Sequence, residues 1–126
     1  MKLNLLAAVI FAFSCQASQA AGNVTYLSCP SLDTRADDLM VILDQPNGTA
    51  SLQSGKSGSG LNFTSPASFG PAQVTWRNDS KGLSQKFSID RVSMELKRET
   101  TSAMTESVYV GKSPCSIAKA PANTKF

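Results

Sequence analysis

Residues 39–53 of the chain, LMVILDQPNGTASLQ, contain its clearest structural signal. The continuous apolar run Leu39–Leu43 is typical of a strand that is buried on both faces. Asn47 and Gly48 tolerate positive φ, so they fit a tight turn after this run. Thr49–Gln53 then alternates in polarity and returns as a second strand. The stretch therefore predicts an antiparallel hairpin, and it leads us to expect an all-β fold.

Outward from this hairpin, the chain consists of short segments of alternating polarity separated by residues that favour turns. The further strands that we expect are Asn23–Cys29, Leu61–Thr64, Ala72–Arg77, Phe87–Ile89, Val92–Glu99 and Ser107–Gly111. The two prolines of Ser65–Pro71 are expected to interrupt a strand, and Asn78–Gly82 is expected to form a turn. This pattern predicts a small antiparallel barrel or sandwich of about seven or eight strands. We favour a barrel, because closure removes the sheet edges.

The apolar pattern changes face at Asp90 and Arg91, between the stripe of Phe87–Ile89 and the stripe that begins at Val92. Such a change predicts a bend or a bulge between two strands. A helix over Arg91–Glu99 stays open as an alternative, because the segment contains several residues that favour helices.

The first twenty residues have the pattern of a secretory signal peptide that is cleaved after Ala20. Met1 and Lys2 supply a basic start, Leu3–Phe13 is almost wholly apolar, and Ser18 and Ala20 are small. The apolar run is too short to span a bilayer, so we expect no transmembrane segment after cleavage. We expect the mature chain in the periplasm or outside the cell.

Cleavage after Ala20 leaves 106 residues, which suffice for a single β domain over residues 21–117 and a flexible tail over residues 118–126. Cys15 leaves a second outcome open. It follows the small residue Ser14, as the cysteine of a lipoprotein signal follows a small residue. A lipidated chain would begin at Cys15 and would have a structural role at the cell envelope.

Two cysteines remain after cleavage, Cys29 and Cys115. Because an exported chain meets an oxidising compartment, we expect them to form one disulfide that closes the domain. The role of this bridge is expected to be structural, since no Cys-x-x-Cys motif is present.

The composition excludes several kinds of chemistry. The chain has no His, which rules out a Ser-His-Asp or Cys-His pair and a His-ligated zinc. Most of its carboxylates are isolated or placed in turns, and the adjacent Asp37 and Asp38 would point opposite ways on a strand. We therefore expect no catalytic residues, no metal site and no cofactor. The net charge of +3, which falls to +2 when Lys2 is removed, is too small to indicate nucleic acid. We therefore expect a binding or accessory protein rather than an enzyme.

We expect the partner to be a protein. The residues that we expect to bind it come from turns, loops and one strand. Ser54–Gly60 is rich in glycine and is expected to be a mobile loop. Arg91 lies between two apolar stripes, where structural pairing and a ligand-facing role are both open. The candidate binding residues are Ser59, Gly60, Phe63, Trp76, Lys81 and Arg91.

The stretch from Trp76 through Phe87-Ser88-Ile89-Asp90-Arg91-Val92 to Leu96, followed by Cys115, resembles small exported bacterial proteins of unknown function. Such proteins often have a Trp strand, then a strand of the Ile-Asp-Arg-Val type, then a late Cys. The resemblance covers about half of the mature chain and implies no activity.

A second resemblance is to periplasmic inhibitors of c-type lysozyme, which are small eight-stranded barrels. The matching order is Tyr26, Cys29, Ser59-Gly60-Leu61-Asn62-Phe63, Trp76, Lys81-Gly82 and Cys115. In that family a Ser-Gly-x-x-Tyr loop enters the lysozyme cleft, and here Phe63 stands where the family has Tyr. The resemblance implies an inhibitor that acts through the loop Ser59–Phe63.

Overall fold

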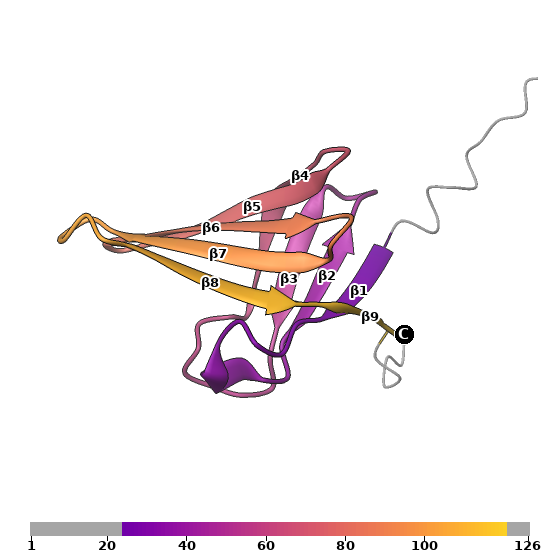
Figure 1. Cartoon of the computed structure of the whole chain (residues 1–126), viewed down its shortest axis with the longest axis horizontal. Helices are drawn as coiled ribbons and strands as arrows, with labels where there is room; N and C mark the ends of the chain where they lie inside the picture. Colours follow the sequence, from indigo (N-terminus) through magenta and orange to yellow (C-terminus); the bar gives the residue numbers. More distant parts are fainter. Residues whose placement is uncertain (1–23, 121–126) are drawn as a thin grey trace, which may run out of the picture.

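The structure, a computed structural model, describes residues 24–120 and contains one antiparallel sheet of nine strands (Figure 1). The strands are β1 (Val24–Ser28), β2 (Met40–Asp44), β3 (Thr49–Gln53), β4 (Phe63–Phe69), β5 (Gln73–Ser80), β6 (Leu83–Asp90), β7 (Glu95–Ser102), β8 (Val108–Pro114) and β9 (Ser116–Ala118). Their order in the sheet is β8-β7-β6-β5-β4-β3-β2-β1-β9. The expected signal peptide and Cys15 lie outside the described residues.

The sheet curls into a nearly closed barrel, so the expected fold class is confirmed. Strand β8 pairs with β7, and the chain then continues through Cys115 into β9, which pairs with β1. The same stretch of chain thus contacts both ends of the strand order and closes the barrel (Figure 1). The strand count is nine rather than seven or eight because the chain pairs again after Pro114, and Ala118 belongs to β9 rather than to a tail.

The expected interruption at Ser65–Pro71 is wrong, because β4 runs through Pro66. The first part of β4 pairs with β3 as far as Pro66, and its last part pairs with β5 from Ala67 onward. Proline lacks a backbone N–H and is normally excluded from central strands. Here it stands where the chain leaves one ladder and joins the next. The strand therefore forms a corner of the barrel at Pro66.

The change of face at Asp90 and Arg91 marks a complete turn between β6 and β7. The alternative of a helix over Arg91–Glu99 is wrong, because the segment forms this turn and the start of β7. The assignment of Val92 to a strand is also wrong, because Val92 lies in the turn and is 90% exposed. The turn between β5 and β6 is also shorter than predicted. It is confined to Lys81 and Gly82, since Asn78 and its neighbours continue β5.

The core fills the barrel and is closed at one end. The fully buried side chains include Phe87, Leu52 and Leu96 on inward positions of the strands. Leu32 and Leu61 come from the connections β1–β2 and β3–β4 and are also buried. These two connections therefore cover one end of the barrel. The outer halves of β5 to β8 project past the barrel as a twisted ribbon (Figure 1).

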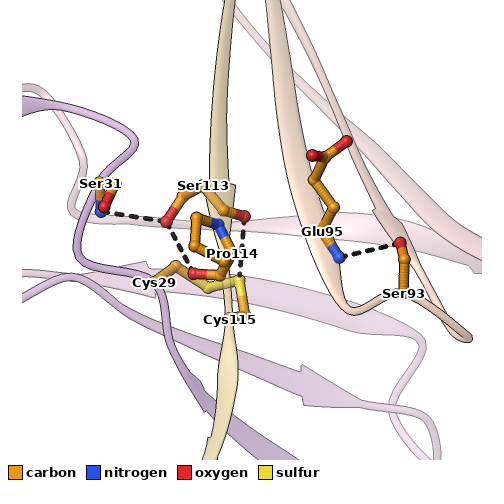
Figure 2. The surroundings of a disulfide bond; sticks show 7 residues. All are labelled: Cys29, Ser31, Ser93, Glu95, Ser113, Pro114 and Cys115. Carbon is orange, nitrogen blue, oxygen red and sulfur yellow. Dashed lines mark hydrogen bonds between the residues drawn. A yellow bond between two sulfur atoms is a disulfide. The ribbon is translucent and has the colours of Figure 1, made fainter.

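The predicted disulfide joins Cys29 to Cys115, with a Cα–Cα distance of 4.4 Å (Figure 2). In the β1–β9 ladder Ser28 is opposite Ser116, so the two cysteines occupy the next opposed positions. Ser113 lies beside the bridge, where its Oγ accepts a hydrogen bond of 3.0 Å from the backbone N–H of Ser31. The bridge thus fixes the point at which the barrel closes.

Within residues 24–120, no helix is long and apolar enough to cross a bilayer.

Candidate binding site at the open end of the barrel

The end of the barrel opposite the two covering connections holds a pocket of about 260 Å³. It lies where β1 and β5 begin, beside the turn that precedes β7, and where β2, β4, β6 and β9 end. Its lining is mostly apolar. The apolar lining residues are Leu27, Leu43, Phe69, Val74, Ile89, Met94 and Ile117. The polar lining residues are Thr25, Gln45, Asp90 and Arg91. The connections at this end are short turns, so they leave the interior accessible.

The turn between β6 and β7 is held by Asp90. One carboxylate oxygen of Asp90 accepts hydrogen bonds from the backbone N–H groups of Val92, at 2.8 Å, and Ser93, at 2.9 Å. These bonds favour the ionised form and lower the pKa of Asp90, with the bond from Ser93 contributing most. The charge of Asp90 therefore holds the turn in shape.

Met94 completes this turn in a conformation that is unusual for a residue with a side chain, with φ of 59°. Its N–H donates to the carbonyl of Asp90 at 2.9 Å, and its own carbonyl accepts from the N–H of Cys115 at 2.9 Å. The side chain of Met94 is half-buried and lines the pocket. The turn is thus bonded to the strand that closes the barrel.

Arg91 is exposed and lies at the rim of the pocket. Its backbone N–H donates to the carbonyl of Ala72 at 2.9 Å, which joins the two turns on this side of the mouth. Its guanidinium makes no ion pair and no hydrogen bond with any residue of the described range 24–120. Of the two roles that the sequence left open, structural pairing of this side chain is not observed among these residues.

The other candidate binding residues do not join Arg91 in one site. Trp76 is only 3% exposed, and its ring stacks on Phe87 with 5.5 Å between centroids. Phe63 is half-buried and packs at a tilt against the same Phe87, with 5.6 Å between the ring centroids. Lys81 lies at the tip of the β5–β6 hairpin. These residues occupy the core and the projecting ribbon.

Ser59 and Gly60 lie in the loop at the closed end, and this loop is tethered to the connection between β1 and β2. Asp38 accepts hydrogen bonds from the Oγ of Ser54, at 2.6 Å, and from the N–H of Gly55, at 2.8 Å. Two further contacts join Lys56 to Asp37 and the guanidinium of Arg35 to the carbonyl of Gly58. The bond from Ser54 is the main reason that the pKa of Asp38 is lowered. Bonds that cross between two connections thus restrain a loop whose composition predicted mobility.

The buried carboxylate of Asp33 was not predicted from the sequence. Asp33 is 8% exposed and accepts two hydrogen bonds from the side chain of Arg35, at 3.0 and 2.9 Å, and one from its backbone N–H at 2.9 Å. Arg98, on β7, approaches to 3.5 Å. These contacts, with the side-chain bond from Arg35 the largest, hold the pKa of Asp33 far below its usual range. The spacing of Asp33 and Arg35 fits a local turn, but no local pattern indicates Arg98.

Comparisons of the chain with protein-family models, with curated proteins and with solved structures found no match. The function is therefore inferred from the chain's own residues.

Proposed function

We propose that the chain is an exported binding protein without catalytic activity, whose open barrel end takes the apolar part of a small amphipathic anion. The observation that carries the proposal is the apolar pocket with Arg91 at its rim. Barrels of about eight strands are just wide enough inside to be filled by side chains or to hold one small ligand.

The size and lining of the pocket define the class of ligand. Ligand sites usually measure roughly 300 to 1,000 Å³, so a volume of about 260 Å³ suits a single short alkyl chain or one ring. Leu27, Val74 and Ile89 provide apolar walls against which such a group loses contact with water. A guanidinium at the rim pairs with a carboxylate, sulfate or phosphate head group. The ligand class is therefore a short-chain or single-ring organic anion.

Export is part of the same proposal. The signal-like segment that ends at Ala20 and the disulfide between Cys29 and Cys115 both fit the periplasm or the extracellular space. Intact-mass measurement of the mature chain separates cleavage after Ala20 from lipidation. A chain that begins at Cys15 and carries added lipid mass would assign it to the envelope instead.

Calorimetric titration with matched alkyl ligands tests the proposed site. Octanoate, octan-1-ol and octylammonium share one chain and differ in head-group charge. We expect octanoate to bind most tightly and octylammonium least tightly. Because Arg91 is exposed and its charge is screened, Arg91→Gln is expected to weaken octanoate binding by about three- to fivefold.

Lys81→Gln is the matched control for that experiment. It removes one exposed positive charge at the tip of the projecting ribbon, away from the pocket, so octanoate affinity should not change. Equal affinities for the three ligands, or equal losses in the two variants, would show that Arg91 does not select the head group. Absence of any binding would end the proposal.

A second candidate function is inhibition of c-type lysozyme through the accessible part of the loop Ser59–Phe63. That part is Ser59 and Gly60, because Leu61 is buried and Phe63 begins β4. The tethering of the loop favours this candidate. Gly60 is exposed, and the bonds of Asp38 to Ser54 and Gly55 hold the neighbouring chain in place. A loop fixed in advance loses little entropy when it enters a cleft. A lysozyme activity assay with increasing chain decides this candidate: inhibition near an equimolar ratio supports it, and full activity at large excess removes it.

A further inference from the structure

A band of positive charge crosses the outer face of the adjacent strands β5, β6, β7 and β8. The cations of this basic band, one from each strand, are Arg77, Lys86, Lys97 and Lys112. Side chains point alternately to the two faces of a strand. Trp76, Phe87 and Leu96, the sequence neighbours of three of these cations, are buried in the core. The cations therefore point away from the barrel interior.

The strand register makes the basic band continuous. Arg77 is directly opposite Lys86 in the β5–β6 ladder, and Lys97 is directly opposite Lys112 in the β7–β8 ladder. Lys97 is also opposite Ser88, two positions along β6 from Lys86, so Lys86 and Lys97 are diagonal neighbours. Directly opposite residues have Cβ atoms roughly 4.5–5.5 Å apart, and like charges in such positions destabilise a sheet. The chain thus keeps two unfavourable cation pairs side by side.

Few internal charges compensate the basic band. Its three lysines make no ion pair and no side-chain hydrogen bond with any residue from 24 to 120. Two carboxylates lie directly beside it. Glu99 is opposite Lys86, and an oxygen of Asp79 lies 3.6 Å from the guanidinium of Arg77. Four positive charges thus meet two negative ones, which leaves an excess of two positive charges.

Two hollows flank the cation pair of Arg77 and Lys86, and both side chains line each hollow. The hollow over β4 and β5 measures about 440 Å³, and its hydroxyl groups are those of Ser65, Ser68 and Thr75. The hollow toward β7 and β8 measures about 300 Å³, and its hydroxyl groups are those of Ser84 and Thr101. A hydroxyl group both donates and accepts hydrogen bonds, so it suits the hydroxyl groups of a sugar.

We propose that the basic band binds an acidic polysaccharide. The carboxylate or sulfate groups of the polysaccharide contact the cations, and its sugar hydroxyl groups bond in the two hollows. None of the four cations lines the pocket at the barrel mouth, so this site is separate from the one proposed for a small anion.

The distribution of charge favours a single chain over a flat anionic surface. The row of the sheet next to the basic band, toward the barrel mouth, contains the carboxylates of Asp90, which ends β6, and Glu95, which begins β7. An anionic membrane laid on this face would meet these carboxylates together with the cations. One polysaccharide chain that follows the band contacts the cations and avoids both.

The absence of a stacking platform disfavours single-stranded nucleic acid, whose bases stack on aromatic side chains. The aromatic residues of β5–β8 are Trp76, Phe87 and Tyr109. The first two are buried in the barrel, and Tyr109 alternates with Val108 and Val110 and so points to the opposite face from Lys112. These four strands, all of them described by the structure, thus present no aromatic ring beside the band.

Calorimetric titration of the mature, oxidised chain with dextran sulfate and with neutral dextran tests the proposal. We expect dextran sulfate to bind with an affinity that falls as salt is raised, and dextran not to bind. Lys86→Gln and Lys97→Gln should each weaken dextran sulfate binding by roughly three- to fivefold. Lys119→Gln, beyond β9, and Arg91→Gln, at the mouth, remove equal charges elsewhere and should leave it unchanged. Equal losses in all four variants would indicate a net-charge effect and would overturn the proposal.

An oligothymidylate and phosphatidylglycerol vesicles, compared at equal concentrations of negative charge, test the class of partner. We expect both to bind more weakly than dextran sulfate. Tighter binding of either one, or no binding of dextran sulfate at low salt, overturns the polysaccharide assignment. Because Lys97→Gln removes a like-charge pair with Lys112, its melting temperature should not fall. A lower melting temperature together with lost binding would make Lys97 a structural residue and would also overturn the proposal.

Discussion

The backbone N–H of Cys115 donates a hydrogen bond of 2.9 Å to the carbonyl of Met94. Cys115 closes the barrel through its disulfide with Cys29, and Met94 ends the turn that carries Arg91. The covalent closure of the fold and the rim of the candidate site are therefore neighbours in one hydrogen-bonded unit. Stability and ligand binding are expected to respond together when this unit is disturbed.

Removal of the disulfide is the first disturbance to test. The bridge spans a sequence separation of 86, and the chain-entropy estimate for a loop of this length is about 4–5 kcal/mol. The variant with Cys29→Ala and Cys115→Ala should lose about that much free energy of unfolding in urea. Its octanoate affinity should also fall, because the turn at Met94 loses its anchor. An unchanged denaturation midpoint would contradict a closing role for the bridge.

Asp33 should make stability depend on pH. Its pKa is lowered in the folded state by the hydrogen bonds from Arg35, so the ionised carboxylate stabilises the fold above the unfolded-state pKa of about 3.9. Asp33→Ala should cost roughly 2 kcal/mol at neutral pH. This cost should shrink as the pH falls through about 3.9 and below, where the original chain also loses the contribution.

Asp37→Ala is the matched control for Asp33. Asp37 pairs with Lys56, and both side chains are more than half exposed. Exposed pairs contribute little, so this variant should change the free energy of unfolding by less than about 1 kcal/mol. Urea titrations of both variants across a pH series provide the comparison. Equal costs for the two variants would show that burial of Asp33 has no special energetic role.

The single tryptophan offers a spectroscopic test of the core. Trp76 is 3% exposed, and its Nε1 has no hydrogen-bond partner in the described range 24–120. Its fluorescence should be blue-shifted relative to the urea-unfolded chain and resistant to quenching by iodide. Octanoate should leave the emission unchanged, since Trp76 does not line the pocket. Strong quenching in the folded state would place the ring elsewhere.

The corner of the barrel at β4 predicts unequal effects for proline substitutions at two neighbouring positions. Pro66→Ala should change stability little, because Pro66 is exposed and stands where one ladder ends and the next begins. The N–H of Ala67 donates to the carbonyl of Gly48 at 2.8 Å. Ala67→Pro removes that donor and should cost at least roughly 2 kcal/mol. Thermal unfolding of the pair tests the register, and similar melting temperatures would refute it.

Much of the fold follows from local sequence, because turns and alternating polarity are local signals. The hairpin around Asn47 and Gly48 is present, and its second strand has the predicted bounds. Its first strand, Met40–Asp44, begins one residue later than predicted and is fully buried on one face only. The cysteine count predicted the disulfide. The extent of β4 was not predicted, because a proline normally ends a strand. Pro66 is tolerated here since the pairing of β4 changes from β3 to β5 at this residue, and that change depends on tertiary pairing.

The candidate site was only partly accessible to prediction. Arg91 was noticed because a charge between apolar stripes is unusual. The pocket beside it is built from β1, β2, β4, β5, β6 and β9, and no local window contains such a combination. Likewise, the tethering of Ser54–Gly60 depends on Asp37 and Asp38, which precede it by a full hairpin. Whether a loop is tethered depends on which charges the fold places beside it.

A negative charge added at the rim should shift the ligand preference toward cations. Ile117 lines the pocket and is 68% exposed, so Ile117→Asp adds a negative charge at the mouth without disturbing the core. This variant should bind octylammonium more tightly than the original chain does, and octanoate less tightly. Met104→Asp, at a more exposed position in the β7–β8 turn, should alter neither affinity. A matching change in both variants would indicate a general charge effect.

The most direct test of the proposed function is an NMR titration of the mature, oxidised chain with octanoate. Its binding should shift the resonances of residues at the open end, above all Val74, Ile89, Arg91 and Met94, and leave those of Ser54–Gly60 in place. The shifts should saturate and should weaken in Arg91→Gln. Saturable shifts centred on the closed end or on the projecting ribbon, or no shifts at all, would contradict a binding site at the barrel mouth.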